Sequence, residues 1–277
     1  MRRRRLLELC GALVSGAGCQ RPSESSDAVT PVPSPDAIGT SAETAASAQA
    51  EITDAAVTPA VVLPNDDSLS VATTSGQYLV LNATVEGTPL DRSTFAFRFD
   101  GTAYKPSEFE NGLYRNGEWG RRFTETGGPL VFDLPEIGTS TDARVTWPDD
   151  EWVPPEPVRT RLEAPLPSFD VTLDGPVRVD ESDAPTLEIT VTNTGDVSGR
   201  YVIALNRVGP RIAYAPVGRF DGELEPGDTD SISRSAKSPY ADGTEPRKVT
   251  YRLDAPGEDN DTVHRIKPAE TETASES

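Results

Sequence analysis

Leu187-Glu188-Ile189-Thr190-Val191-Thr192-Asn193 is the stretch that decides the fold of this chain. Its residues alternate between apolar and polar, so that Leu187, Ile189 and Val191 face one way while the polar residues face the other. A period of two is the pattern of a β-strand with one buried face. Residues 193–196, Asn-Thr-Gly-Asp, then predict a turn.

The surrounding residues predict further short strands at similar spacing. Tyr201, Ile203 and Leu205 form the inward face of a return strand, and residues 225–228 predict a second turn. Other strands are predicted at residues 169–173, around Ile232 and at Val249, Tyr251 and Leu253. About seven short strands in roughly 100 residues fit an immunoglobulin-like sandwich.

Two pieces of this region resemble a known family. Ile189-Thr190-Val191-Thr192-Asn193-Thr194-Gly195, then Gly199 and Leu224-Glu225-Pro226-Gly227-Asp228, resemble the CARDB-type domain (cell-adhesion-related domain found in bacteria) and its relatives on archaeal surface proteins. The resemblance implies an immunoglobulin-like fold over residues 168–268 and a cell-surface setting. It carries no catalytic residues with it.

An earlier region shows the same period of two. In residues 77–85, the apolar residues from Leu79 to Val85 face one way, and Asn82 lies on the opposite face. Further strands are predicted at residues 95–99, 129–134, 143–147 and 158–162, with turn signals between them. Residues 75–78 together with 95–104 resemble a small immunoglobulin-like family of unassigned function found in exported lipoproteins. We find no helical period.

The predicted fold class is therefore all-β, with two immunoglobulin-like β-sandwich domains at residues 61–164 and 168–268. Prolines gather between residues 148 and 168 and mark the boundary, because proline prefers sheet edges and turns. The last strand of the first domain is expected near residues 159–162. Residues 269–277 are a polar, acidic tail that we expect to be disordered.

Residues 19–60 are rich in Ser, Ala, Thr, Pro and acidic residues. Such a segment cannot bury enough apolar surface to offset its chain entropy, so we expect a disordered linker. Before it, residues 1–18 carry four arginines, a short apolar run and small residues, which is typical of an export signal. The apolar run is too short for a spanning helix, which needs about 20 apolar residues.

Two parts of this signal resemble known targeting motifs. Arg3-Arg4 followed by Leu6-Leu7 resembles the twin-arginine export signal, and Gly16-Ala17-Gly18-Cys19 resembles a lipobox. The lipobox resemblance implies that Cys19 becomes the lipidated first residue, although Gly16 stands where lipoboxes usually carry leucine. The alternative is an ordinary cleaved signal with an accidental cysteine.

Acidic residues dominate the composition. The 277 residues carry a net charge of -19, and removal of residues 1–18 leaves 22 basic and 44 acidic residues. Only four basic residues of the remaining chain are lysines. This acidic, lysine-poor composition resembles proteins of halophilic archaea and implies solubility at high salt, where charge repulsion is screened. Nucleic acid is an unexpected partner, because no basic patch is present to neutralise phosphates.

The sequence lacks the residues for several kinds of chemistry. Its two cysteines, Cys10 and Cys19, lie in the signal and at the lipidation site, and His264 is the only histidine. A disulfide in the exported chain, a cysteine-based metal site and a histidine-rich metal site are therefore excluded. We expect no catalytic residues, no metal and no cofactor, and we interpret His264 as an exposed residue of a late strand.

Three other residues are candidate sites. Trp119 lies between glycines and could stack on a sugar or enter a partner's pocket, or it could anchor its loop on the core. Asn82 and Asn260 begin Asn-x-Thr patterns that fit N-glycosylation acceptors. Residues 257–261 carry oxygen ligands suited to Ca²⁺, but a solvated acidic loop is the simpler interpretation.

These observations favour a non-enzymatic cell-surface lipoprotein that acts as a binding, adhesion or assembly module on the outer face of the cell membrane. Its expected partners are the membrane, through a lipid on Cys19, and an envelope protein or glycan. Two alternatives stay open. A carbohydrate-acting hydrolase would need two carboxyl groups about 5–9.5 Å apart in a cleft. A passive spacer would expose no sizeable apolar patch.

Overall fold

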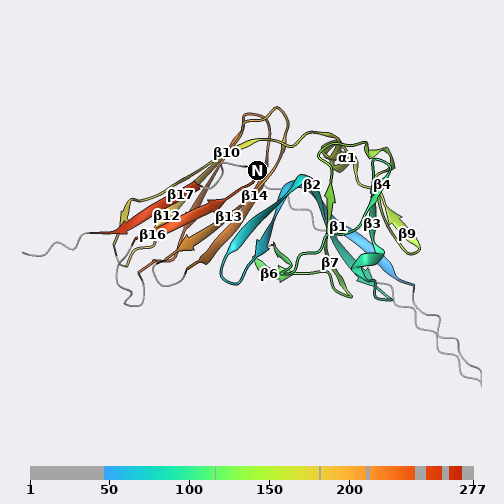
Figure 1. The fold of residues 1–277 in the computed structure, drawn as a ribbon, viewed down its shortest axis with the longest axis horizontal. Coiled ribbons are helices and arrows are strands. Elements are labelled where there is room, and N and C mark those ends of the chain that lie inside the picture. The colour runs from blue at the N-terminus through green and yellow to red at the C-terminus, as the bar shows by residue number, and fades with distance from the viewer. Residues whose placement is uncertain are drawn as a thin grey trace, which may run out of the picture. The chain divides into compact units, whose positions relative to one another are not determined.

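More than half of the described residues lie in β-strands, almost all of them in antiparallel pairs, and the all-β sandwich fold predicted from the sequence is confirmed (Figure 1). The computed structural model describes residues 47–115, 117–180, 182–209, 213–240, 248–257 and 262–269. These residues belong to one compact unit, which contains two main hydrophobic cores. The signal, Cys19, Asn260 and most of the acidic tail lie outside the described residues, so the predictions for them stay predictions.

The N-terminal core lies between two sheets, one ordered β1-β2-β7 and the other β4-β3-β8-β9, and a small β5-β6 sheet accompanies them. Their bounds are β1 Gln49–Pro64, β2 Leu69–Glu86, β3 Ala96–Phe99, β4 Thr102–Tyr104, β5 Leu113–Arg115, β6 Glu118–Arg121, β7 Gly127–Leu134, β8 Arg144–Trp147 and β9 Asp150–Trp152. Two 3-10 turns, η1 Arg92–Thr94 and η2 Ser140–Asp142, connect strands within this region.

The C-terminal core lies between a sheet ordered β10-β12-β15 and a larger sheet ordered β11-β17-β16-β13-β14. The bounds are β10 Phe169–Asp174, β11 Arg178–Val179, β12 Thr186–Asn193, β13 Gly199–Val208, β14 Ala215–Leu224, β15 Thr229–Ser235, β16 Val249–Asp254 and β17 Thr262–Pro268. All pairs are antiparallel except the short β11–β17 pair.

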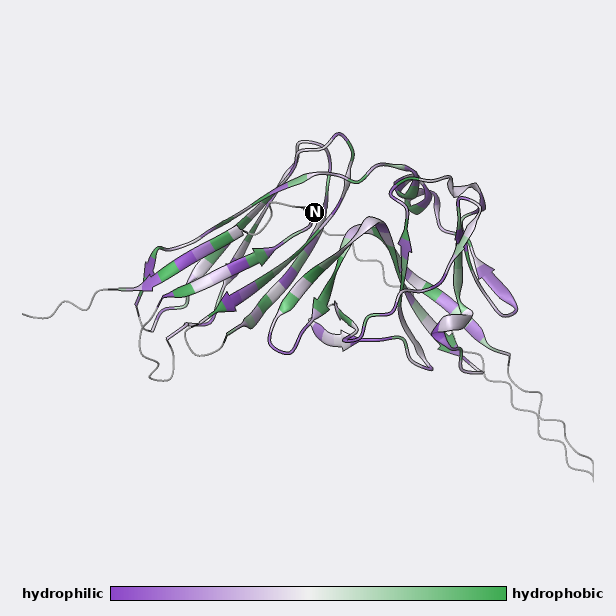
Figure 2. Cartoon of the chain, in the orientation of Figure 1, coloured by the Kyte–Doolittle hydropathy of each residue, from purple (hydrophilic) through white to green (hydrophobic). Residues whose placement is uncertain are grey.

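Alternation in the sequence explains these strands. Leu187, Ile189 and Val191 of β12 are fully buried, and the alternation appears as successive green and purple segments along the C-terminal strands (Figure 2). In β2, the residues predicted to face inward, from Leu79 to Val85, lie in the N-terminal core. The predicted strands at residues 95–99, 129–134 and 143–147 correspond to β3, β7 and β8.

The two sequence pieces that carry the CARDB-type resemblance pack on each other. The backbone N–H of Asn193 donates to the carbonyl of Asp228 at 3.0 Å, and its carbonyl accepts from Gly227 at 2.9 Å. The Asn193 side chain donates to the carbonyl of Leu224 at 2.9 Å and accepts from the N–H of Gly195 at 3.0 Å. One buried asparagine therefore joins both turns.

The predicted end of the linker is wrong. Residues 49–60, assigned to a disordered segment, form most of β1 and pair with β2 from Gln49–Glu86 to Ala60–Thr73. Their Ala- and Thr-rich composition gives little apolar signal, but β2 supplies backbone partners along most of their length. The compact region therefore begins well before residue 61.

The strand predicted at residues 158–162 is also wrong, because the helix α1 covers Glu156–Glu163. Pro157 stands in its first turn, where the missing N–H needs no partner. Leu162 is fully buried on the N-terminal core, and Val158, one turn earlier, packs beside it. In the described part of the chain, no helix is long and apolar enough to cross a membrane.

The hairpin of β1 and β2 contributes to more than one core. Pairing between the strands is interrupted after Thr58–Tyr78 and resumes at Ala60–Thr73. Before this interruption the hairpin pairs with β7 and covers the N-terminal core. Beyond it, Val62 and Leu69 pack with Val202 and Ala204 of β13 in a separate small cluster.

Candidate functional site

The structure places two of the predicted site residues in one hollow. Trp119 of β6 and Asn82 of β2 both line a pocket of about 490 Å³. The remaining lining comes from polar or small residues of the same region: Ala83, Thr84, Glu118, Arg121, Arg122, Thr124, Thr126, Gly127 and Gly128. This pocket is called the Trp119 pocket below.

Trp119 is held in place although it faces solvent. Its side chain is 47% exposed, and its ring meets the ring of Tyr114 edge to face, with centroids 5.7 Å apart and planes at 83°. Tyr114 lies on β5, the partner strand of β6. Next to Trp119, Glu118 forms an ion pair with Arg121. The indole therefore presents a supported apolar surface beside charged groups.

Asn82 lies in the central strand of the β1-β2-β7 sheet and is half-buried. Its side-chain amide donates to the hydroxyl of Thr53 at 3.1 Å, and that hydroxyl donates to the backbone carbonyl of Asn82 at 3.2 Å. The amide nitrogen that would carry a glycan is therefore engaged with β1. Because Asn82 lines the Trp119 pocket, a glycan on Asn82 and a free ligand there would exclude each other.

A second pocket lies where the β1-β2 hairpin meets β13 and β14. Its volume is about 190 Å³, and three arginines from different parts of the sequence line it: Arg115, Arg200 and Arg219. Its apolar lining includes Val61, Val62, Val80, Leu113 and Val202. This pocket is called the arginine pocket below.

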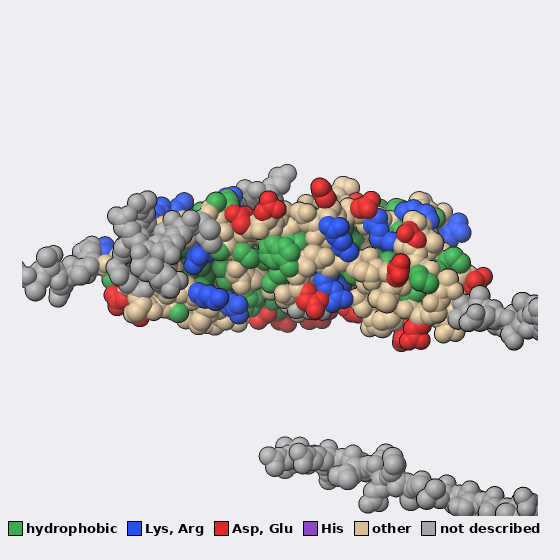
Figure 3. All heavy atoms as spheres, turned by 90° about the horizontal axis from the view of Figure 1, so that it is seen from below, with side chains coloured by type: hydrophobic (Ala, Val, Ile, Leu, Met, Phe, Trp, Pro, Cys, Tyr) green, Lys and Arg blue, Asp and Glu red, His purple; other side chains and the backbone are tan. Residues whose placement is uncertain are grey.

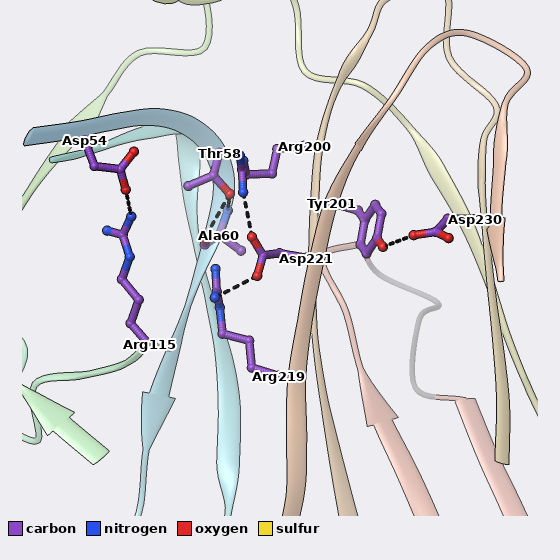
Figure 4. Close-up of polar contacts among 9 residues, drawn as sticks. All are labelled: Asp54, Thr58, Ala60, Arg115, Arg200, Tyr201, Arg219, Asp221 and Asp230. Atoms are coloured by element: carbon purple, nitrogen blue, oxygen red, sulfur yellow. Dashed lines mark hydrogen bonds and ion pairs between the residues drawn. The ribbon is translucent and has the colours of Figure 1, made fainter. Parts of the chain in front are cut away.

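Two carboxylates partly balance the three guanidinium groups (Figure 4). Asp221 accepts from Arg200 at 2.5 Å through one oxygen and pairs with Arg219 at 2.7 Å through the other. Asp54 pairs with Arg115. The pocket therefore carries one more positive than negative side chain, in a protein whose net charge is -19.

The arginine side chains are largely removed from water. The side chains of Arg115 and Arg219 are each 18% exposed. Burial lowers the pKa of the Arg219 guanidinium, the charge of Asp221 opposes this shift, and the charges of Arg115 and Arg200 add to it. Within the described residues, Nη1 of Arg115 is buried and has no hydrogen-bond partner.

Local sequence patterns do not single out these arginines. One signal was present: Val202-Ile203-Ala204-Leu205 is continuously apolar, and all four residues are buried. Continuous apolar runs are typical of strands covered on both faces. The run indicates that the outer face of β13 is covered, and Arg200 lies at the edge of that covered face.

The other candidates contribute less. His264 is half-buried in β17, not exposed as expected, and its Nε2 lies 3.1 Å from the carbonyl of Pro176. Most of the acidic loop at residues 257–261 lies outside the described residues. Among the residues that are described, no group of three or more His, Cys, Asp or Glu side chains has the arrangement of a metal site.

One face of the molecule carries basic and acidic side chains side by side (Figure 3). A group of hydrophobic side chains lies among them near the middle of this view. On this face, acidic side chains are therefore interspersed with apolar and basic areas.

The sequence matches no protein-family model and no curated protein. Part of the chain is similar to solved structures of β-glucosidases. These include EmGH1 from Erythrobacter marinus (20% identity, TM-score 0.32), the enzyme from Listeria innocua in complex with isofagomine (14%, 0.32) and DesR from Streptomyces venezuelae in complex with D-glucose (15%, 0.29). The matches cover 38% of this chain and 16%, 17% and 15% of those chains, respectively. Such partial similarity assigns neither a family nor an activity.

Proposed function

We propose that this chain is a non-enzymatic lipoprotein on the outer face of the cell membrane, where it acts as a binding module for an envelope glycan. The observation that carries the binding role is the exposed Trp119, supported by Tyr114 and facing a pocket lined with polar groups. The anchor is the lipid expected on Cys19. The acidic surface keeps the module soluble at high salt.

The chemistry of the Trp119 pocket suits a sugar. The apolar face of a sugar ring stacks on an aromatic ring, while its hydroxyl groups need donors and acceptors around the edge. Thr84 and Thr126 supply hydroxyl groups, and Arg121 and Arg122 supply guanidinium groups along the same pocket. The Tyr114 contact fixes the indole, which lowers the entropy lost on binding.

The binding role is tested by titrating the full-length chain with glycans released from its own cell envelope. Trp119→Ala is expected to weaken binding by about thirtyfold, as loss of a central aromatic anchor does. Val177→Ala is the matched control, because Val177 is 66% exposed and does not line the Trp119 pocket. Equal binding by both variants would contradict the proposal, and glycan cleavage during the titration would favour the hydrolase instead.

The anchor is tested separately by fractionating cells that produce Cys19→Ser. We expect the wild-type chain in the membrane fraction, with lipid mass on an N-terminal Cys19, and the variant in the medium with unchanged solubility. Recovery of the wild-type chain wholly in the medium would rule out the anchor. It would leave the binding role of Trp119 to be decided by the titration.

A further inference from the structure

The arginine pocket has the features of a site for a small anion with an apolar part. Arg115, Arg200 and Arg219 converge on it from β5, β13 and β14, and valine side chains of the β1-β2 hairpin form part of its wall. Charge-assisted hydrogen bonds from guanidinium groups are the usual means of holding a carboxylate. The apolar wall would contact a hydrocarbon group on the same ligand.

The two carboxylates in the pocket leave part of this donor capacity unused. Asp221 uses one oxygen for Arg200 and the other for Arg219, and Asp54 pairs with one nitrogen of Arg115. Within the described residues, the other terminal nitrogen of Arg115 is buried without a partner. A buried donor without a partner is uncommon in a native structure and calls for an explanation, such as an ordered water, an ion or a functional role.

The size of the pocket limits the ligand. About 190 Å³ is smaller than the roughly 300–1,000 Å³ typical of sites for drug-sized molecules, so only a small molecule fits. We propose that the arginine pocket binds a small carboxylate with a short hydrocarbon chain, with Arg115 as the main donor to the carboxylate. This assignment does not rest on the glycan-binding role, although Tyr114 both lines the arginine pocket and contacts Trp119.

Calorimetric titration of the full-length chain with butanoate tests the proposal, with butanamide and sulfate as comparison probes at constant ionic strength. We expect saturable binding of butanoate and much weaker binding of butanamide, which has nearly the same shape but no charge. We also expect weak binding of sulfate, which has charge but no hydrocarbon chain. Equal binding of all three probes, or no saturable binding of butanoate, would overturn the assignment.

Two variants separate a binding role from a structural role, because they are expected to change butanoate affinity in opposite directions. Arg115→Gln removes the main donor and should weaken butanoate binding about ten- to a hundredfold, the range for a hydrogen bond to a charged group. Asp54→Asn removes the carboxylate that competes for Arg115, and should tighten butanoate binding. Asp54 is 55% exposed, so this change is tolerable for the fold.

Arg144→Gln is the matched control, since Arg144 also pairs with a carboxylate, that of Glu151, but does not line the arginine pocket. It should bind butanoate like the wild type. Weakening by both Arg115→Gln and Asp54→Asn would indicate a purely structural role for the pair and would overturn the proposal. Butanoate binding and glycan binding are measured in separate titrations of the wild type, so failure of this inference is distinguished from failure of the glycan-binding role.

Discussion

The side chain of Asn206 forms two hydrogen bonds with the backbone of Leu69, accepting from its N–H at 2.8 Å and donating to its carbonyl at 2.8 Å. Asp254 accepts from the N–H of Val71 in the same way, also at 2.8 Å. These side chains occupy the edge of β2 beyond the part that pairs with β7. An unpaired sheet edge is a site for unwanted association, and here two side chains cover it.

The Asn206–Leu69 contact should stabilise the chain measurably. Asn206 is 3% exposed, so Asn206→Ala would leave two buried backbone groups of Leu69 without partners. We expect a loss of about 2–4 kcal/mol in the free energy of unfolding, measured by denaturant titration at high salt. Asn65→Ala is the control, because Asn65 is exposed and its side-chain amide donates to the hydroxyls of Ser68 and Ser70. Equal effects of the two variants would contradict this interpretation.

Gly76 lies at the interruption in the β1-β2 pairing and has no room for a side chain. A Cβ there would lie 2.1 Å from the carbonyl oxygen of Leu134 and 2.7 Å from the N–H nitrogen of Glu136. Because backbone must move to relieve this, we expect Gly76→Ala to destabilise the fold by about 3 kcal/mol. Gly218→Ala should change stability by less than about 1 kcal/mol, since its new Cβ would make only ordinary contact with Phe220. Thermal unfolding of both variants checks the contrast.

Two buried tyrosines of the C-terminal core differ in their hydroxyl groups. Tyr201 donates to a carboxylate oxygen of Asp230 at 2.5 Å, whereas the Tyr251 hydroxyl is buried without a partner among the described residues. We expect Tyr201→Phe to destabilise the chain at neutral pH by about 1–3 kcal/mol. Tyr251→Phe should be neutral or slightly stabilising there, because it removes an unpaired buried hydroxyl. Denaturant titration at pH 7 would contradict this account if it gave the opposite order.

Stability should also fall at high pH. Burial raises the pKa of Tyr251 from 10.0 to about 12, so the folded chain holds that proton more tightly than the unfolded chain. The resulting stabilisation is present below about pH 10 and is lost as the pH rises towards about 12. Tyr251→Phe should flatten this decline only in part. The rest of the decline comes from Tyr201, whose pKa is also raised, by burial and by Asp230. Identical pH profiles for Tyr251→Phe and wild type would contradict the assignment.

The acidic surface predicts a dependence on salt. With a net charge of -19, like charges repel one another in the folded chain, and this repulsion is screened when the Debye length falls to about 3 Å near 1 M salt. The unfolding temperature should therefore rise between about 0.05 M and about 2 M salt, because the Debye length shortens over this range and screening becomes strong. A flat or falling unfolding temperature over this range would contradict the interpretation.

Sequence patterns predicted the strands whose two faces differ. β12 and the part of β2 from Leu79 to Val85 alternate clearly, and their apolar residues are buried as expected. The patterns failed where tertiary partners decide the structure. Residues 49–60 become a strand because β2 pairs with them. Val158 and Leu162 fit both a strand and one face of a short helix, and eight residues are too few to distinguish the two periods.

The candidate site was predicted only in part, because tertiary contacts also decide which residues come together there. Trp119 and Asn82 were both identified from local patterns, but nothing in the sequence placed them in one pocket. The arginine pocket depends on the β1-β2 hairpin lying against β13. Residues in this contact are far apart in the sequence, as the pair Leu69 and Asn206 illustrates with a separation of 137 positions. Pairings at such separation leave no local pattern, apart from the continuous apolar run at residues 202–205.

The fluorescence of Trp119 during titration with envelope glycans tests the central claim most directly. Trp119 is the most exposed of the three tryptophans, since Trp147 is buried and Trp152 is half-buried. We predict a saturable change in emission in the wild type and in Val177→Ala, and loss of both the change and the binding in Trp119→Ala. Glycan binding of unchanged affinity in Trp119→Ala, or no glycan binding by the wild type, would contradict the proposed function.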